Sequence, residues 1–360
     1  VEAGARAAAL ADALAARIEA GGPIGFDEFV DHALYAPELG FYAAGGGAGR
    51  RRDFLTSPEV GPLFGAVVAS ALDRWWDHLG RPDPFPVVEA GAGPGTLARA
   101  ILAAGPRCGG ALELVLVERA EVQWATHPPG VSTRADLPAP GELGVGPVVV
   151  LANELLDNLP FGLLERGPAG WDEILVDLAP AAGGSDGGGP RFVEVHRPLE
   201  PIRAAWCHGR AGRDVAVGAR IPVQADAAAW LDRALALAGP GGGVVVLDYA
   251  STTPALARRP WTDWVRTYAA HGRGGGPLDA PGTCDLTVEV ATDQLATVER
   301  PSRDRSQAAF LAAHGIEALV AEGRARWAAE GYGGGVAALA ARSRVPEAAA
   351  LTDPAGLGAF

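Results

Sequence analysis

A glycine-rich run is the part of the sequence that most clearly indicates chemistry: Glu89-Ala90-Gly91-Ala92-Gly93-Pro94-Gly95, between an apolar stretch and a helix-like stretch. Glycines at such a place let a ligand approach the backbone closely. The dinucleotide fingerprint G-x-G-x-x-G requires a glycine at position 96, where Thr96 stands instead. A carboxylate just before the loop also repels a pyrophosphate, which a glycine loop and helix N-terminus otherwise bind. The alternative is a tight strand-to-helix turn in a glycine-rich protein.

A nucleoside ligand without phosphate suits this loop better. S-adenosylmethionine carries an ammonium and a sulfonium, so Glu89 would attract it directly or through water. Glu118 follows the next apolar stretch and is placed to accept both ribose hydroxyls, although dinucleotide enzymes share that feature and an exposed strand-end carboxylate is the alternative. Asp136, after a third stretch, is a candidate acceptor for the adenine amino group. The candidate cofactor site consists of these acids with Gly91, Ala92, Gly93 and Gly95.

A second polar cluster, Asn153-Glu154-Leu155-Leu156-Asp157, follows an apolar run where doubly wound enzymes project substrate-facing groups. Methyl transfer needs mainly alignment in a water-poor pocket. If the cluster forms one helical turn, Glu154 and Asp157 share a face and can clamp a guanidinium, then take up the proton released on alkylation. We expect Asn153, Glu154 and Asp157 to be catalytic. The alternative is that Asn153 and Asp157 cap the next helix while Glu154 is solvated.

Five short apolar runs predict the strands that position these residues: 86–89, 112–117, 131–134, 148–152 and 244–249. Their β-branched residues follow one another without alternation, which is typical of parallel strands covered on both faces. We therefore expect a doubly wound α/β core over residues 85–160 and 225–300, with binding residues at the carboxyl ends of its strands.

The sequence predicts three regions. They are an N-terminal helical region at 1–80 that closes over the site, the α/β core at 81–160 and 225–360, and an insertion on the substrate side at 161–224. Within 1–80, Ser57-Pro58-Glu59 predicts a helix start, with Ser57 as the capping hydroxyl and Pro58 in the first turn.

The insertion is predicted to contain a hairpin. Trp171–Leu178 and Arg191–Val195 are expected to pair, with a mobile tip at 179–190 that is rich in glycine, serine and proline. Residues 252–283 are expected to be irregular, either roofing a substrate site or decorating the surface. A final strand is expected to begin near Phe360.

Composition disfavours several classes of function. With 30 basic and 43 acidic side chains, a formal net charge of −13 and a pI of 5.0, the chain lacks the footprint of a nucleic-acid binder. At 48% hydrophobic residues, it can bury a large core. No apolar run reaches the roughly 18–20 residues of a membrane span. Cys108, Cys207 and Cys284 are scattered, which favours reduced thiols and disfavours a disulfide framework or a metal site.

The first 20 residues do not resemble a targeting segment. Their acids, Glu2, Asp12 and Glu19, disfavour a transit peptide, and the lack of an apolar h-region disfavours a signal peptide. The sequence has no lysine or methionine and much glycine, alanine and arginine, which indicates GC-rich codon usage and a bacterial genome. We therefore expect a cytoplasmic protein, and the oligomeric state stays open.

Several segments, taken in order, resemble the MidA-type S-adenosylmethionine-dependent methyltransferases. They are Tyr35–Tyr42, Asp53–Glu59, Phe64-Gly65, Glu89–Leu97, Ala152–Pro160, Asp248-Tyr249, Arg266–His271, Pro281–Thr287 and Ser306–Leu311, which together run from near residue 22 to near 320. There are departures: Arg52 and Ala250 stand where the family usually has glycine, Pro94 interrupts the loop, and Cys284 replaces a polar residue. Ala250 puts the shape of the loop after the fifth strand in question.

The resemblance implies a class I methyltransferase fold with an added helical and hairpin substrate region. It implies that Gly91, Gly93 and Gly95 line the cofactor with Glu118 on its ribose, that Thr56, Ser57 and Pro58 close over the site, and that Asn153, Glu154 and Asp157 face cofactor and substrate. The family includes a mitochondrial factor that methylates an arginine of a respiratory complex I core subunit and aids its assembly. A protein substrate is therefore implied, with a respiratory-complex subunit as one candidate.

Three hypotheses remain. The leading one is methyl transfer from S-adenosylmethionine to a protein arginine; an acidic surface suits a basic peptide, although the charge can equally serve solubility. The alternative is a cofactor-binding assembly factor or chaperone with little catalytic activity. A third hypothesis is a nicotinamide oxidoreductase. It predicts glycine at position 96, and Thr96 stands there instead, which disfavours it.

Overall fold

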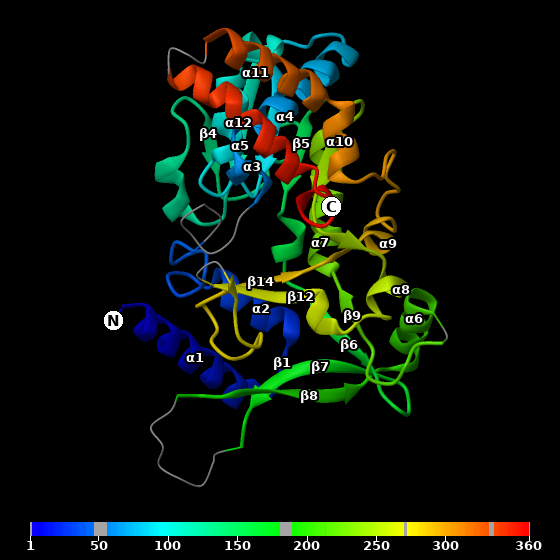
Figure 1. Cartoon of the computed structure of the whole chain (residues 1–360). Helices are drawn as coiled ribbons and strands as arrows, with labels where there is room; N and C mark the ends of the chain where they lie inside the picture. Colours follow the sequence, from blue (N-terminus) through cyan, green and yellow to red (C-terminus); the bar gives the residue numbers. More distant parts are fainter. Residues whose placement is uncertain are drawn as a thin grey trace.

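The computed structural model describes residues 2–46, 56–180, 189–212, 214–269, 272–330 and 335–359. It has two parts: an α/β core in the upper half of Figure 1, and below it a second lobe built largely from antiparallel strands. The chain passes between the two parts several times, so neither part is one continuous segment.

The α/β core is built on a five-stranded parallel sheet with the order β10-β5-β2-β3-β4. Its strands are β2 (Phe85–Ala90), β3 (Leu112–Val117), β4 (Ser132–Arg134), β5 (Val149–Asn153) and β10 (Gly243–Leu247). The five predicted strands are confirmed, with small shifts at their ends. Because the strand order reverses beside β2, the carboxyl ends of β2 and β5 form the switch point where such sheets bind ligands.

Helices cover both faces of this sheet, which confirms the doubly wound α/β core. Side chains alternate along a strand, so Val87 packs into one layer and Val88 into the other. One face is covered by α3 (Ser57–Val60), α4 (Pro62–His78), α5 (Thr96–Ala104), α10 (Gln307–Ala313), α11 (Ile316–Glu330) and α12 (Val336–Leu351), and the other by α7 (Ala225–Ala238). Burial on both sides explains the continuous apolar runs.

The second lobe contains an antiparallel sheet with the order β1-β7-β6-β9, in which β8 also pairs with β7. Its strands are β1 (Ile24–Gly25), β6 (Gly162–Arg166), β7 (Trp171–Leu178), β8 (Phe192–Pro198) and β9 (Arg220–Val223). Helix α6 (Pro201–Ala211), between β8 and β9 in the chain, lies beside this sheet (Figure 1). The hairpin was correctly predicted, although β8 begins one residue later and ends three residues later than expected. Most of its tip, 181–188, lies outside the described residues.

Residues 1–80 are distributed between both parts. Helices α1 (Glu2–Gly21) and α2 (Phe26–Tyr35) bury Leu14 and Phe29 in the core of the second lobe, together with Ile174 of β7. Helices α3 and α4 instead pack in the α/β core, where Phe64 is fully buried. The sequence predicted a helical region here, but not the layer that each helix joins.

Residues 252–283 are only partly irregular: short elements occupy parts of 253–273, whereas 274–283 contain no helix or strand, as predicted. The stretch around them contains β11 (Ala250–Ser251), α8 (Thr253–Leu256), η4 (Trp261–Asp263), β12 (Val265–Ala269), β13 (Gly272–Arg273), β14 (Asp285–Val288), β15 (Val290–Ala291) and α9 (Thr292–Leu295). β12 pairs with β13 and β14, and Trp264 and Leu286 enter the second lobe's core. These strands are short and carry polar residues such as Thr267, so they lack the apolar run that indicates a strand. Residues 357–359 form a short 3-10 turn, and Phe360, where a final strand was expected to begin, lies outside the described residues.

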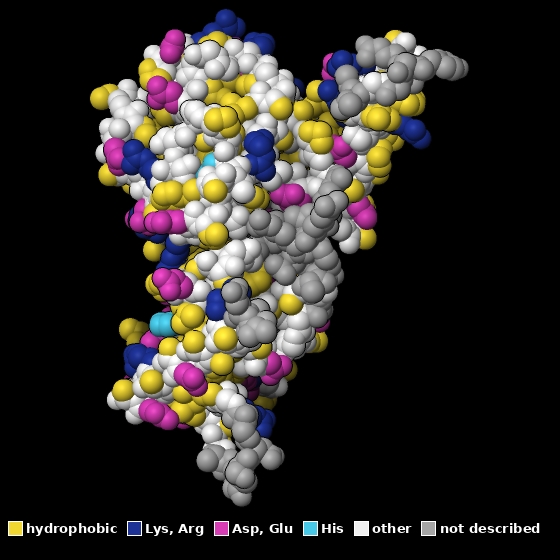
Figure 2. Space-filling model, turned by 90° about the vertical axis from the view of Figure 1, so that its left-hand side faces the viewer, with side chains coloured by type: hydrophobic (Ala, Val, Ile, Leu, Met, Phe, Trp, Pro, Cys, Tyr) yellow, Lys and Arg dark blue, Asp and Glu magenta, His cyan; other side chains and the backbone are white. Residues whose placement is uncertain are grey.

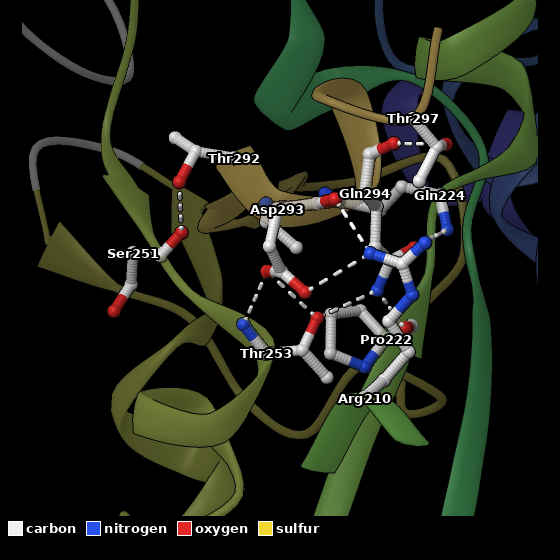
Figure 3. Close-up of polar contacts among 10 residues, drawn as sticks. Arg210, Pro222, Gln224, Ser251, Thr253, Thr292, Asp293, Gln294 and Thr297 are labelled. Atoms are coloured by element: carbon white, nitrogen blue, oxygen red, sulfur yellow. Dashed lines mark hydrogen bonds and ion pairs between the residues drawn. The ribbon is translucent and has the colours of Figure 1, made fainter. Parts of the chain in front are cut away.

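A buried polar network joins the two parts where the chain passes from β9 into α7 and from β15 into α9 (Figure 3). The side chain of Gln294 accepts from the backbone N–H of Gln224 at 3.1 Å and donates to the hydroxyl of Thr253 at 3.1 Å. Asp293 accepts from the backbone N–H of Thr253 at 2.6 Å. Because buried polar groups are costly unless paired, this network favours one arrangement of the crossing segments.

The surface is mixed in charge. Among the described side chains on the face shown in Figure 2, acidic and basic groups are interspersed and form no extended patch of one sign. No helix among the described residues is long and apolar enough to cross a bilayer. The described residues also contain no group of three or more His, Cys, Asp or Glu side chains that could hold a metal ion.

Candidate active site

A cavity of about 290 Å³ lies where the carboxyl ends of β2, β3 and β5 meet the second lobe. Most of the predicted site residues line it: Thr56, Pro58, Glu89, Gly91, Ala92, Gly93, Glu118, Asp136, Asn153 and Glu154. Among the described residues of the prediction, Ser57, Gly95 and Asp157 are not part of the lining. Most of the predicted site residues therefore meet at one cavity, and these three do not line it.

The glycine loop has a backbone that favours glycine at three positions. Gly91, Gly93 and Gly95 have φ angles of 70°, 51° and 74°, in the left-handed region that other residues rarely adopt. A Cβ on Gly91 would lie 2.9 Å from Leu155, whereas a Cβ on Gly93 would meet no atom within 4 Å. Gly93 therefore keeps open space beside the cavity. His127 supports the loop, since its Nε2 lies 2.8 Å from the Gly93 carbonyl oxygen.

Glu118, directly after β3, is fixed by backbone donors. Its carboxylate accepts from the N–H of Gly93 at 2.8 Å and from the N–H of Ala120 at 2.7 Å. Burial raises the pKa of Glu118, while these two hydrogen bonds oppose that change. Each carboxylate oxygen can accept more than one hydrogen bond, so the group remains able to receive hydroxyl donors from the cavity.

Glu89, near the end of β2, is a buried acid without a full set of partners. It is 4% exposed, and its Oε2 has no hydrogen-bond partner among the described residues. Burial raises the pKa of Glu89 to about 8, although the charge of Arg99 partly offsets that effect. A buried carboxyl group of this kind is stabilised by a cation or a donor that enters the cavity.

Glu154 follows β5 in a left-handed conformation with φ of 51°, which is uncommon for a residue other than glycine. Its Oε1 accepts from the backbone N–H of Ser57 at 3.0 Å and from Nδ2 of Asn153 at 3.3 Å. Although part of the side chain faces the cavity, its loss of solvent raises the pKa of Glu154 to about 8. The solvated alternative for Glu154 is therefore wrong. The carboxamide Oδ1 of Asn153 is buried and has no partner among the described residues.

Asp157 does not share a helical turn with Glu154, so the geometric basis of the predicted clamp is wrong. The 3-10 turn η3 (Leu156–Asn158) begins only after Glu154. Asp157 is 5% exposed, and burial together with the nearby Asp248 raises its pKa well above the usual range. The turn is capped by Asp248, whose Oδ2 accepts from the N–H of Leu156 at 2.9 Å, rather than by Asn153 or Asp157.

The segment Thr56-Ser57-Pro58 reaches the cavity from the start of α3. Pro58 stands in the first turn, as predicted, but Ser57 is not the capping hydroxyl. Thr56 occupies the N-cap position, and the fully buried Ser57 hydroxyl donates to Oε1 of Gln307 at 2.8 Å. The preceding residues Asp53-Phe54-Leu55, like Arg52, lie outside the described residues.

Several cavity residues were missed by sequence reasoning. Tyr35, Tyr42 and Asn158 line the cavity, and Asp285 lies behind them, where it accepts from the Tyr42 hydroxyl at 2.8 Å. Asp248 had a usable signal, because it stands at the end of the predicted run 244–249. Asp285 had none before the resemblance, because its strand β14 was not predicted.

The cavity fits S-adenosylmethionine. A ligand with an ammonium and a sulfonium would meet the acceptor oxygens of Glu89 and Asn153, which have no partner among the described residues, and open space at Gly93 of the glycine loop. A Rossmann-like parallel sheet with a glycine loop at its switch point and acids near the ends of two adjacent strands is the arrangement expected of the class I methyltransferases, and dinucleotide-binding enzymes share it.

The chain belongs to one family within that class. Residues 67–307 match a family model described as "Putative S-adenosyl-L-methionine-dependent methyltransferase". The protein is therefore an S-adenosylmethionine-dependent methyltransferase, and the predicted cofactor and family are confirmed.

Relatives and solved structures agree with this assignment. The mitochondrial "Protein arginine methyltransferase NDUFAF7 homolog" of Drosophila melanogaster is 27% identical over 317 residues, which is 78% of this chain and 68% of that protein. Human NDUFAF7, also named a protein arginine methyltransferase, is 28% identical over 76% of this chain and 65% of its own length. A Burkholderia thailandensis crystal structure of a "likely methyl transferase bound to S-adenosyl-homocysteine" superposes with a TM-score of 0.79 and 28% identity, covering 99% of this chain and 91% of that one.

Proposed function

We propose that this methyltransferase transfers a methyl group to an arginine side chain of a protein substrate. The observation that carries the proposal is Glu154, a largely desolvated carboxyl group at the cavity, held by the backbone of Ser57. A buried carboxylate is suited to a guanidinium, which offers five N–H donors and a positive charge. The names of the curated relatives as protein arginine methyltransferases support the same substrate class.

The residues around the loop would hold the cofactor. Gly93 leaves room for it, Glu118 would accept from the ribose hydroxyls, and Asp136 would accept from the adenine amino group. Glu89 and the Oδ1 of Asn153 would accept from the ammonium group. When bound, S-adenosylmethionine supplies a methyl group on a sulfonium, which needs an aligned nucleophile rather than further activation.

Glu154 would orient the acceptor and take up its proton. In the protein without ligands, a pKa of about 8 keeps this carboxyl group largely protonated at neutral pH. An arriving guanidinium and sulfonium stabilise the ionised form, so the carboxylate is generated when a cationic substrate is present. It then lies where a nitrogen loses a proton on alkylation.

The test is methyl transfer from radiolabelled S-adenosylmethionine to lysate proteins of a strain that lacks this gene. We expect label on protein, recovered after digestion as methylated arginine, and far less label with Glu154→Gln. Tight binding of S-adenosylhomocysteine by calorimetry without label above background would contradict the proposal and support the assembly-factor alternative. Label recovered on a residue other than arginine would support protein methyltransferase activity but refute arginine as the acceptor.

A further inference from the structure

Two tyrosines of the second lobe line the cavity beside Glu154 and Asn158. Tyr35 ends α2, and Tyr42 lies in the turn that follows. Their rings are stacked, with centroids 5.5 Å apart and planes inclined by 18°. Neither residue is among those that would hold the cofactor, so this wall of the cavity is available to the methyl acceptor.

Each of these tyrosines already uses its single hydroxyl hydrogen. Tyr42 donates to Oδ1 of Asp285 at 2.8 Å, and Tyr35 donates to the backbone oxygen of Asn158 at 3.2 Å. Burial, and next the charge of Asp285, raise the pKa of both phenols, so the hydrogens stay in place. A group that reaches either phenol oxygen from the cavity can therefore donate to it but cannot accept from it.

The groups around the two tyrosines are also paired with one another. The amide Nδ2 of Asn158 donates to Asp285 at 3.0 Å. The guanidinium of Arg119 lies 4.5 Å from the centre of the Tyr35 ring and pairs with Asp31 at 3.0 Å, so its charge is matched by that carboxylate. Tyr35 and Tyr42, together with Glu154 once a bound sulfonium favours its ionised form, present accepting oxygens to the cavity.

We infer that Tyr35 and Tyr42 are specificity-determining residues that receive the N–H groups of a cationic nitrogen acceptor and reject carboxylate acceptors. This inference rests on the proposed function, whose substrate class it deepens. A guanidinium or ammonium has only donors, so it satisfies these oxygens. A carboxylate has only acceptors and would face lone pairs and Glu154, which raises the cost of its desolvation. Asp285 acts as a positioning residue because it holds the Tyr42 hydrogen away from the acceptor.

Sinefungin and S-adenosylhomocysteine provide a test that needs no protein substrate. Sinefungin is the cofactor analogue in which a CH–NH3⁺ group replaces the S–CH3 sulfonium, so its ammonium lies where the transferred methyl group would lie and directs N–H donors toward the acceptor region of the cavity. By calorimetry on the full chain, we expect sinefungin to bind at least about tenfold more tightly than S-adenosylhomocysteine, as charged hydrogen bonds imply. In Tyr42→Phe, which keeps the stacked ring, this preference should fall at least about fivefold while S-adenosylhomocysteine affinity stays within about threefold.

The matched control is Tyr268→Phe, because Tyr268 lies on β12 next to Asp285 in the sheet but outside the described lining of the cavity. It should leave the preference unchanged. The inference is overturned if S-adenosylhomocysteine is the tighter ligand of the unaltered protein, or if Tyr42→Phe and Tyr268→Phe keep the same preference. Neither result bears on protein arginine methylation, which the labelling experiment tests separately. Failure of this inference and failure of the proposed function can therefore be told apart.

Discussion

Two carboxyl groups with pKa values of about 8 line the same cavity, Glu89 near the end of β2 and Glu154 after β5. In both cases burial is the largest cause of the shift. Burying two acids costs stability, and Arg99 offsets this only in part for Glu89, so the arrangement needs another explanation. A cationic ligand explains it, because the ligand restores the ionised state that burial disfavours.

Glu89→Gln tests this explanation through stability. The folded-state pKa is raised, so the protonated carboxyl group favours folding below pH 4.5, and that contribution is lost as the pH rises toward 8. Glutamine cannot ionise, so at pH 8 the ligand-free variant should melt higher than the unaltered protein by about 2–4 °C, and the difference should vanish near pH 5. Differential scanning fluorimetry across that pH range measures the effect.

The same substitution should weaken ligand binding. We expect the Kd for S-adenosylhomocysteine to rise at least about tenfold in Glu89→Gln, because a charged hydrogen bond to the ammonium is lost. A higher melting temperature with unchanged S-adenosylhomocysteine affinity would show that Glu89 destabilises the fold without contributing to ligand binding. Lower melting at pH 8 would contradict the raised pKa itself.

Glu154→Gln should instead separate catalysis from binding. With cofactor saturating, kcat/KM for the protein acceptor should rise with pH and level off at or below about pH 8, since the sulfonium lowers the pKa of the carboxyl group. The variant should lose this rise and at least about a hundredfold in turnover, while binding S-adenosylhomocysteine within about threefold. The same pH profile in both proteins would remove Glu154 from the proton transfer.

At the scale of elements, the loop between β2 and α5 illustrates what sequence can and cannot supply. The glycine spacing, the strand before it and the helix after it were all predicted, because they depend on local conformational preference. The clamp of Glu154 and Asp157 failed because a helical turn was assumed where β5 continues to Asn153 and Glu154 adopts a positive φ. Tyr42 and Asp285 are separated by 243 positions, so no local pattern joins them.

Two of the loop glycines, Gly91 and Gly93, should respond differently to alanine. Gly93→Ala places a methyl group in open space beside the cavity, so we expect S-adenosylhomocysteine affinity to fall at least about tenfold, with a stability loss of about 1–2 kcal/mol from the left-handed backbone. Gly91→Ala adds a 2.9 Å approach to Leu155 and should lose more stability. Urea unfolding and calorimetry measure both effects. Equal affinities for Gly93→Ala and the unaltered protein would remove the loop from the binding site.

At the scale of the whole molecule, the cavity exists because two separately packed cores meet. One wall comes from the parallel sheet and the other from α2 and the turn after it, so the relative placement of the two parts determines the site. The sequence revealed the parallel core because its strands are apolar and regularly spaced. It did not reveal that residues before 47 and the segment 256–291 complete the second lobe, because that association depends on packing between distant segments.

The buried hydrogen-bond network around Gln294 links segments of both parts, so its loss should lower the free energy of unfolding. Gln294→Leu keeps similar volume but leaves the backbone N–H of Gln224 and the carbonyl oxygen of Pro222 without their side-chain partners. We expect the free energy of unfolding in urea to fall by about 2–4 kcal/mol, since buried groups lose their hydrogen bonds. Thr297→Val is the control, because it removes one local bond to the Gln294 carbonyl and should cost less than about 1 kcal/mol. Equal losses in the two variants would place the stabilising role in the turn after α9, and the network between the two parts would then contribute little to holding the cavity walls together.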